Sequence, residues 1–85
     1  MTFRQIPPHV AEVIRHLPPD VKLSVRAALR EIVANPEAGV PLHGSLAGLL
    51  KFRVRRFRIV YSVHQELRTI RLYAVGHRRE IYERS

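Results

Sequence analysis

The run from Lys51 to Tyr61 constrains the fold more than any other part of the chain, because charged and apolar residues alternate along it. Successive side chains of a β-strand point to opposite faces of a sheet. Phe52 and Val54 can therefore be buried while Arg53 stands with other cations on the opposite face. The alternation resumes after a two-residue break, so the run predicts a β-hairpin with one apolar and one basic face.

Three strands are expected in the second half of the chain, at about residues 50–55, 57–63 and 69–75. The turn between the first two lacks the glycine that such turns favour. Strict alternation in the third strand predicts one face of Ile70, Leu72 and Ala74 and an opposite face of Arg71, Tyr73 and Val75. Gly76 is expected to end this strand.

Two helices are predicted before these strands. Apolar residues at helical spacing indicate a first helix from Pro8 to Leu17. The second helix starts at Pro19, where proline is well tolerated, and ends at Asn35, because the residue before a proline avoids the α region. The segment from Thr2 to Ile6 is expected to form a short strand.

Together these elements predict a single α+β domain over residues 1–85. A short N-terminal strand and an αα-hairpin pack on one face of a small antiparallel sheet, and the other face is basic and exposed. The chain has no cysteine for a disulfide framework. No apolar run approaches the roughly 20 residues of a membrane span. A cytoplasmic protein is expected, without membrane contact.

The charge of the chain lies mainly in its second half. The formal net charge is +8, and residues 51–85 hold ten of the fifteen Lys and Arg residues but three of the seven acidic ones. A sheet face with this much fixed charge repels itself, which favours an anionic partner. Most of the cations are arginines, whose planar fork suits phosphate, and RNA is the partner that we expect.

Several short motifs follow one another in a characteristic order: Asn35-Pro36, Leu42-His43-Gly44, Gly48, Arg53-Val54, Phe57-Arg58-Ile59-Val60-Tyr61, Val75-Gly76-His77-Arg78 and Ile81-Tyr82. As a set they resemble the RelE/ParE toxin superfamily of type II toxin–antitoxin systems, and especially its RelE branch. The resemblance covers essentially the whole chain. It implies a microbial-RNase-like fold and an endoribonuclease that cuts mRNA in the ribosomal A site, with the RNA 2′-OH attacking the adjacent phosphate.

The same resemblance implies a set of catalytic residues: Lys51, Arg53, Arg58, His77, Arg78 and Tyr82. Lys51 would accept a proton, since neighbouring cations favour its neutral form; it could also be an ordinary solvated strand lysine. Arg53 and Arg58 would hold the phosphate and stabilise its developing charge. No cofactor and no metal ion are expected.

Three of these residues lie near the end of the chain. Arg78 follows Gly76 and would reach into the cleft. Tyr82 would stack on a base or exchange a proton, unless it only packs on the sheet. Histidine is the natural general acid or base at neutral pH, so His77 would replace Lys51 as the main proton carrier, unless it is a hydrogen-bonded turn residue.

The remaining arginines of the basic half are assigned to electrostatic docking on RNA: Arg55, Arg56, Arg71 and Arg79. The resemblance also implies several partners. These are a cognate antitoxin that folds on binding, the ribosome with its mRNA, and promoter DNA through the toxin–antitoxin complex. Two other functions stay open: a ParE-like inhibitor of DNA gyrase without nuclease activity, and an inactive nucleic-acid-binding module.

Overall fold

The computed structural model describes residues 2–3 and 6–77. Its elements, in chain order, are β1 (Thr2–Phe3), α1 (Pro8–Arg15), α2 (Pro19–Ala34), the 3₁₀ turn η1 (Pro36–Ala38), β2 (Val40–Pro41), the 3₁₀ turn η2 (Gly44–Leu46), β3 (Leu50–Val54), β4 (Phe57–His64) and β5 (Thr69–His77). The strands form one sheet in the order β1-β5-β4-β3-β2. β1 runs parallel to β5, and the other neighbours are antiparallel. The predicted α+β fold is confirmed.

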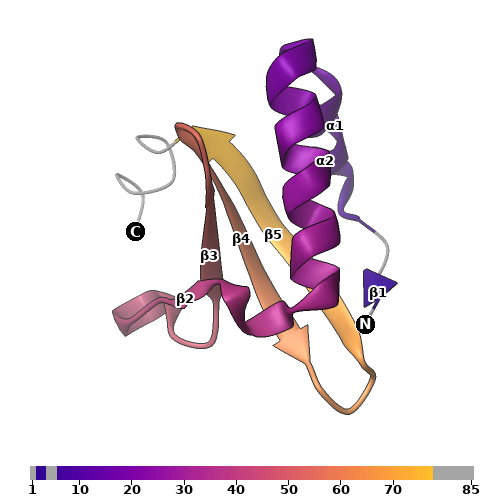
Figure 1. The fold of residues 1–85 in the computed structure, drawn as a ribbon. Helices are drawn as coiled ribbons and strands as arrows, with labels where there is room; N and C mark the ends of the chain where they lie inside the picture. The colour runs from indigo at the N-terminus through magenta and orange to yellow at the C-terminus, as the bar shows by residue number, and fades with distance from the viewer. Residues whose placement is uncertain (1, 4–5, 78–85) are drawn as a thin grey trace.

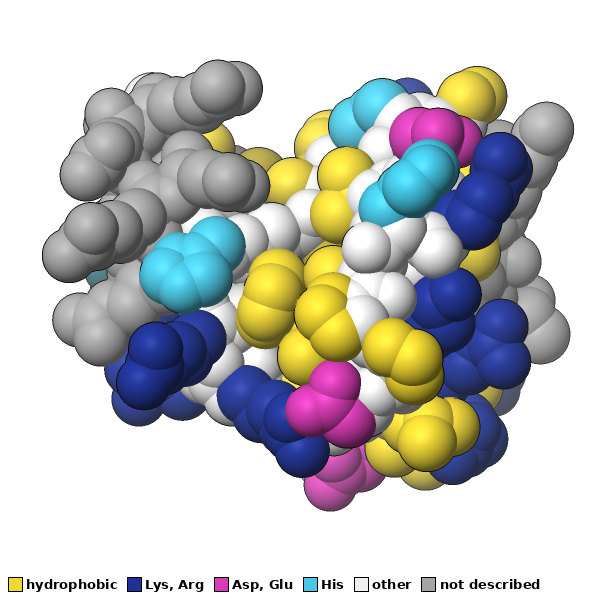
Figure 2. Space-filling model, turned by 90° about the horizontal axis from the view of Figure 1, so that it is seen from above, with side chains coloured by type: hydrophobic (Ala, Val, Ile, Leu, Met, Phe, Trp, Pro, Cys, Tyr) yellow, Lys and Arg dark blue, Asp and Glu magenta, His cyan; other side chains and the backbone are white. Residues whose placement is uncertain are grey.

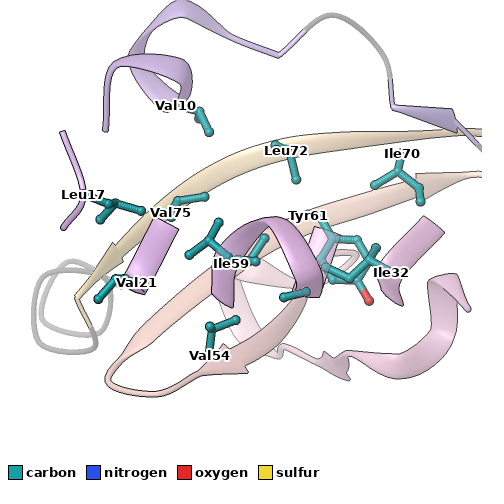
Figure 3. Packing of buried hydrophobic residues seen from close by; sticks show 12 residues of the cluster. Val10, Leu17, Val21, Ile32, Val54, Ile59, Tyr61, Ile70, Leu72 and Val75 are labelled. Carbon is teal, nitrogen blue, oxygen red and sulfur yellow. The ribbon is translucent and has the colours of Figure 1, made fainter. Parts of the chain in front are cut away.

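Both helices lie on one side of the long strands β3, β4 and β5 (Figure 1). The core forms between these two layers, from residues of α1, α2 and the three strands: Val10, Leu17, Val21, Val25, Ala28, Ile32, Val54, Ile59, Tyr61, Ile70, Leu72 and Val75 (Figure 3). Tyr61 is the largest fully buried side chain. In the described part of the chain, neither helix has the length and hydrophobicity needed to cross a bilayer.

The prolines set the helix boundaries close to where the sequence predicts them. α1 ends at Arg15, two residues earlier than expected, because the backbone leaves helical geometry at His16, just before the Pro18-Pro19 pair. Leu17 is buried all the same. α2 ends at Ala34, and Asn35 before Pro36 is extended with a φ of −142°. The described N-terminal strand is Thr2–Phe3, and Ile6, which the sequence predicts to belong to it, is not in a strand.

A β-bulge in β5 overturns the predicted faces of Ala74 and Val75, whereas Ile70, Arg71, Leu72 and Tyr73 lie on the faces predicted for them. Val60 pairs with Ala74 and Tyr61 pairs with Leu72, so Tyr73 is an extra residue without a partner of its own on β4. A bulge of this kind shifts the alternation by one. Val75 is consequently buried in the core, and Ala74 lies beside Val60 on the face turned away from the helices, which we call the outer face.

The prediction that Gly76 ends the third strand is also wrong. β5 continues through Gly76 to His77, and these two residues pair with Arg58 and Phe57 of β4. The bulge supplies the physical reason, because it lets the strand bend and keep its ladder with β4 to the end. Gly76 therefore lies directly opposite Arg58, and it is buried.

The turn between β3 and β4 consists of Arg55 and Arg56, and it is held by an ion pair. Arg55 adopts a left-handed φ of 56°, which is strained for a residue with a side chain. Its Nη1 donates a hydrogen bond of 2.8 Å to Oδ2 of Asp20 in the first turn of α2. The pair joins the hairpin to the helix layer.

We expect this ion pair to make stability depend on pH in acid. The hydrogen bond from Arg55, with a smaller contribution from the Val21 amide, holds the pKa of Asp20 below its ordinary value of 3.8. A depressed folded-state pKa adds stability above the unfolded pKa and loses it as the pH falls through the folded pKa. Between about pH 4 and pH 2, the unfolding free energy should therefore fall less steeply in Asp20→Asn than in the wild type, measured by urea unfolding. Equal slopes would contradict this, and Arg55→Gln should fall between the wild type and Asp20→Asn, because the Val21 amide still lowers the pKa of Asp20.

Candidate functional site

Three of the predicted site residues meet on the outer face of the sheet. Lys51 and Arg53 extend from β3 and Arg58 from β4, and Arg53 lies directly opposite Arg58. We call these three residues the cationic cluster. Together with Val40 of β2 they line a hollow of about 210 Å³. The alternation in the sequence thus brings the cations together on one face, as predicted.

The cationic cluster is electrostatically unfavourable for the sheet that carries it. Like charges directly opposite each other on neighbouring antiparallel strands are destabilising, and Arg53 and Arg58 form such a pair. Lys51 adds a third cation at the same hollow. The arrangement is suited to a small anion with several oxygens, because guanidinium forks bind phosphate and carboxylate in a bidentate manner.

Part of the outer face is buried, contrary to the expectation of an exposed basic face. Arg58 is 6% exposed, and Val60 and Ser62 on the same strand are 5% and 8% exposed. The reason is the position of β4 between β3 and β5, whose side chains flank it on both sides. Arg53, by contrast, is exposed. The cationic cluster therefore contains one buried guanidinium group, that of Arg58, and one exposed guanidinium group, that of Arg53.

Removing one cation should stabilise the free protein. We expect Arg53→Gln to raise the unfolding free energy by roughly 0.2–1 kcal/mol, since the opposed charge is lost while the strand position is kept. The gain should shrink as salt is added, because salt screens the repulsion between exposed charges. Urea unfolding of the wild type and of Arg53→Gln, at low and at high ionic strength, measures this gain in unfolding free energy. A variant that is less stable than the wild type at low salt would contradict the prediction.

His77 lies on the other face of the sheet from the cationic cluster. It pairs with Phe57, whose side chain packs against the core, and the two rings meet edge-on at a centroid distance of 5.7 Å. The structure therefore does not bring His77 together with Lys51. The β5 bulge is the cause, because it moves every later residue of the strand to the opposite face.

The arginines predicted to dock RNA lie at separate places. Arg55 pairs with Asp20, and Arg56 is exposed in the same turn. Arg71 is exposed on the outer face at β5, with its guanidinium carbon 5.5 Å from the centre of the Tyr73 ring. Seen from above, Lys and Arg side chains lie in several groups around the periphery, with hydrophobic side chains exposed between them (Figure 2). Arg78, Arg79 and Tyr82 lie outside the described residues.

Val40 is a site residue that the sequence did not reveal. It pairs with Lys51 in the two-residue strand β2 and supplies the apolar wall of the hollow. Two residues are too few for an alternation to be read, and the proline that follows argues against a strand. Within residues 2–3 and 6–77, no three His, Cys, Asp or Glu side chains gather closely enough to hold a metal ion.

The family of the chain follows from comparison with known sequences. The sequence model of the ParE toxins, from parDE type II toxin–antitoxin systems, matches residues 9–82. The chain is a member of the RelE/ParE superfamily of type II toxins. No curated protein matches the toxin significantly. The family resemblance inferred from the sequence motifs is thus confirmed.

Solved structures of RelE toxins share the fold of this toxin. The RelBE2 toxin–antitoxin complex of Mycobacterium tuberculosis contains a chain with 28% identity and a TM-score of 0.80, over 91% of this chain and 96% of that one. Isolated RelE of E. coli shows 26% identity and a TM-score of 0.75, over 96% and 92%. The intact E. coli RelBE complex, at 21% identity and a TM-score of 0.75 over 88% and 94%, shows the fold alone.

Proposed function

We propose that this toxin is a ribosome-dependent endoribonuclease that cleaves mRNA in the A site and so inhibits translation. The observation that carries the proposal is the direct opposition of Arg53 and Arg58 at a hollow that Lys51 also lines. A phosphodiester in this hollow would offset the repulsion between the cations. The similarity to RelE toxins supports the proposal that mRNA is the substrate.

The reaction requires the protein to accept a proton, to stabilise negative charge on the phosphate and to donate a proton. The RNA 2′-oxygen loses its proton and bonds to the adjacent phosphorus, the bond from phosphorus to the 5′-oxygen breaks, and that oxygen takes up a proton. The products are a 2′,3′-cyclic phosphate and a 5′-hydroxyl. In our proposal Arg58 and Arg53 bind the non-bridging oxygens and stabilise the charge that builds up in the transition state.

Lys51 is the proton acceptor that the described geometry favours over His77. It lines the hollow with both arginines, whereas His77 packs against Phe57 on the opposite face. Arg78 and Tyr82, which the family resemblance adds, would supply a further phosphate contact and the proton for the leaving oxygen.

A cognate antitoxin is the protein partner expected of a type II toxin, and several solved relatives are RelBE complexes. One surface suited to it is an apolar hollow of about 370 Å³ along α2, lined by Arg26, Leu29, Arg30 and Val33. An acidic amphipathic segment would match its charge and its apolar floor. We propose that the antitoxin also covers the cationic cluster, and that the complex binds promoter DNA mainly through the antitoxin. A ribosomal target implies a cytoplasmic protein.

Cleavage of a defined mRNA on programmed ribosomes tests the proposal. Folded, antitoxin-free toxin should produce cuts within the A-site codon, mapped by primer extension, and the cuts should require ribosomes. Absence of cuts from a folded protein would overturn the nuclease proposal.

Inhibition of DNA gyrase is the alternative, and the match to the ParE family model favours it. It predicts that the toxin blocks supercoiling of relaxed plasmid by purified gyrase while leaving mRNA on ribosomes intact. The two assays on one preparation separate the functions, because the nuclease proposal predicts the opposite result in both.

A further inference from the structure

An aromatic ring and a guanidinium group lie together on the outer face of β5, apart from the cationic cluster. Tyr73 is 40% exposed, one of the few large apolar side chains on the described surface. The guanidinium carbon of Arg71 lies 5.5 Å from the centre of its ring. The pair therefore presents two planar, delocalised groups at the surface.

The β-bulge fixes the position of this pair. Tyr73 and Ala74 together oppose Val60 of β4, so the bulge places an additional side chain on the outer face. The backbone is also held from the helix layer, since Nε2 of His9 donates a hydrogen bond of 3.1 Å to the Tyr73 carbonyl. Bulges of this kind commonly direct a side chain toward a functional site.

Tyr73 lies beside the row of the sheet that contains Lys51 of the cationic cluster, and Arg71 pairs with Ser62 in a neighbouring row. Lys51 pairs with Val60, and Val60 pairs with Ala74, next to Tyr73. Two strand spacings separate Lys51 from Ala74, which is about 10 Å. Among the described residues, the side chain between them in this row is that of Val60, which is small.

We propose that Arg71 and Tyr73 form a stacking platform for an unpaired base of the RNA strand whose phosphate occupies the hollow. The inference rests on the proposed ribonuclease function and adds a base-binding subsite to it. Single-stranded RNA is bound by combining cationic contacts to its backbone with bases stacked on aromatic or guanidinium planes. The outer face holds both kinds of group, in neighbouring rows of the sheet. Arg71 then acts by stacking as well as by charge.

A short oligouridylate with one central 2-aminopurine, 2′-O-methylated throughout so that it resists cleavage, is the probe. The fluorescence of 2-aminopurine is quenched when it stacks, and uridine competes poorly for a stacking site. The wild type and Tyr73→Phe, which keeps the ring, should bind the probe and quench it. Tyr73→Leu should abolish most of the quenching and weaken binding roughly 5- to 100-fold. Arg71→Lys keeps the charge and should also reduce quenching.

Binding and quenching in Tyr73→Leu equal to those of the wild type would overturn the platform. So would failure of the folded wild type to bind the probe at low salt. A probe that replaces 2-aminopurine with an abasic residue should bind wild type and Tyr73→Leu equally, which separates stacking from general loss of fold. Ribosomal cleavage measured in parallel distinguishes the two ideas: a toxin that cleaves mRNA but shows no effect at Tyr73 lacks the platform, and one that stacks the probe without cleaving lacks the nuclease function.

Discussion

Replacing Arg58 by lysine is expected to lower the single-turnover rate of mRNA cleavage on programmed ribosomes by about 10²- to 10³-fold. The variant keeps the positive charge but loses the planar fork that contacts two phosphate oxygens at once. The loss should be in the chemical step at saturating ribosome, because the charge that Arg58 stabilises develops in the transition state. Arg58→Ala should cleave no faster than Arg58→Lys.

The matched control for this experiment is Arg30→Lys. Arg30 is an exposed arginine of α2 and lies on the helix layer, not on the outer face. The same chemical change there should leave the cleavage rate of the antitoxin-free toxin unchanged. Cleavage by Arg58→Lys within a few-fold of the wild type would remove Arg58 from the active site. It would also leave the cross-strand pair with Arg53 without a catalytic explanation.

The predictable part of the fold is the part whose residues follow a period. Alternation from Leu50 to Tyr61 predicts the face of each side chain of β3 and β4 correctly, but the degree of burial less well, because Phe52 is only half-buried and Arg58 and Val60 on the outer face are buried. Prolines at 19 and 36 predict the limits of α2 to within one residue. These signals are local, because each depends on the backbone of a few neighbouring residues.

The bulge in β5 could not be predicted from the residues of the strand itself. No glycine or proline marks it, since the extra residue is Tyr73 in a run of ordinary strand formers. The bulge exists because of pairing with β4 and packing against the helices, and those contacts are not encoded within the strand itself. Its effect on the site is large, because it separates His77 from the cationic cluster. The faces of the cations of β3 and β4, and of β5 as far as Tyr73, could therefore be assigned from sequence, whereas those of the later β5 residues could not.

The hydroxyl of Tyr61 is expected to be worth about 1–3 kcal/mol to the stability of the toxin. It accepts a hydrogen bond of 2.9 Å from the Gly39 amide and donates one of 2.8 Å to the Pro36 carbonyl. Tyr61→Phe removes the hydroxyl and leaves the Gly39 amide, which is buried, without this acceptor. Tyr61→Ala should cost more, about 3–5 kcal/mol, because it also leaves a cavity in the core. Urea unfolding at neutral pH measures both losses.

Loss of the Tyr61 hydroxyl should also affect the hollow at the cationic cluster, because Tyr61 holds the segment from Pro36 to Gly39 that leads into β2. A Cβ on Gly39 would lie 2.5 Å from the Tyr61 hydroxyl and 2.9 Å from the Lys51 carbonyl, so the loop, the ring and β3 fit closely. Burial raises the pKa of Tyr61 above its ordinary value of 10.0, so the wild type should lose stability as the pH rises beyond 10 and Tyr61→Phe should lose less.

We expect Tyr61→Phe to cleave mRNA more slowly even where it is fully folded, since Val40 of the loosened strand lines the hollow. A Tyr61→Phe toxin as stable as the wild type would show that the two hydrogen bonds do not hold this loop, and the coupling to the site would fail with them.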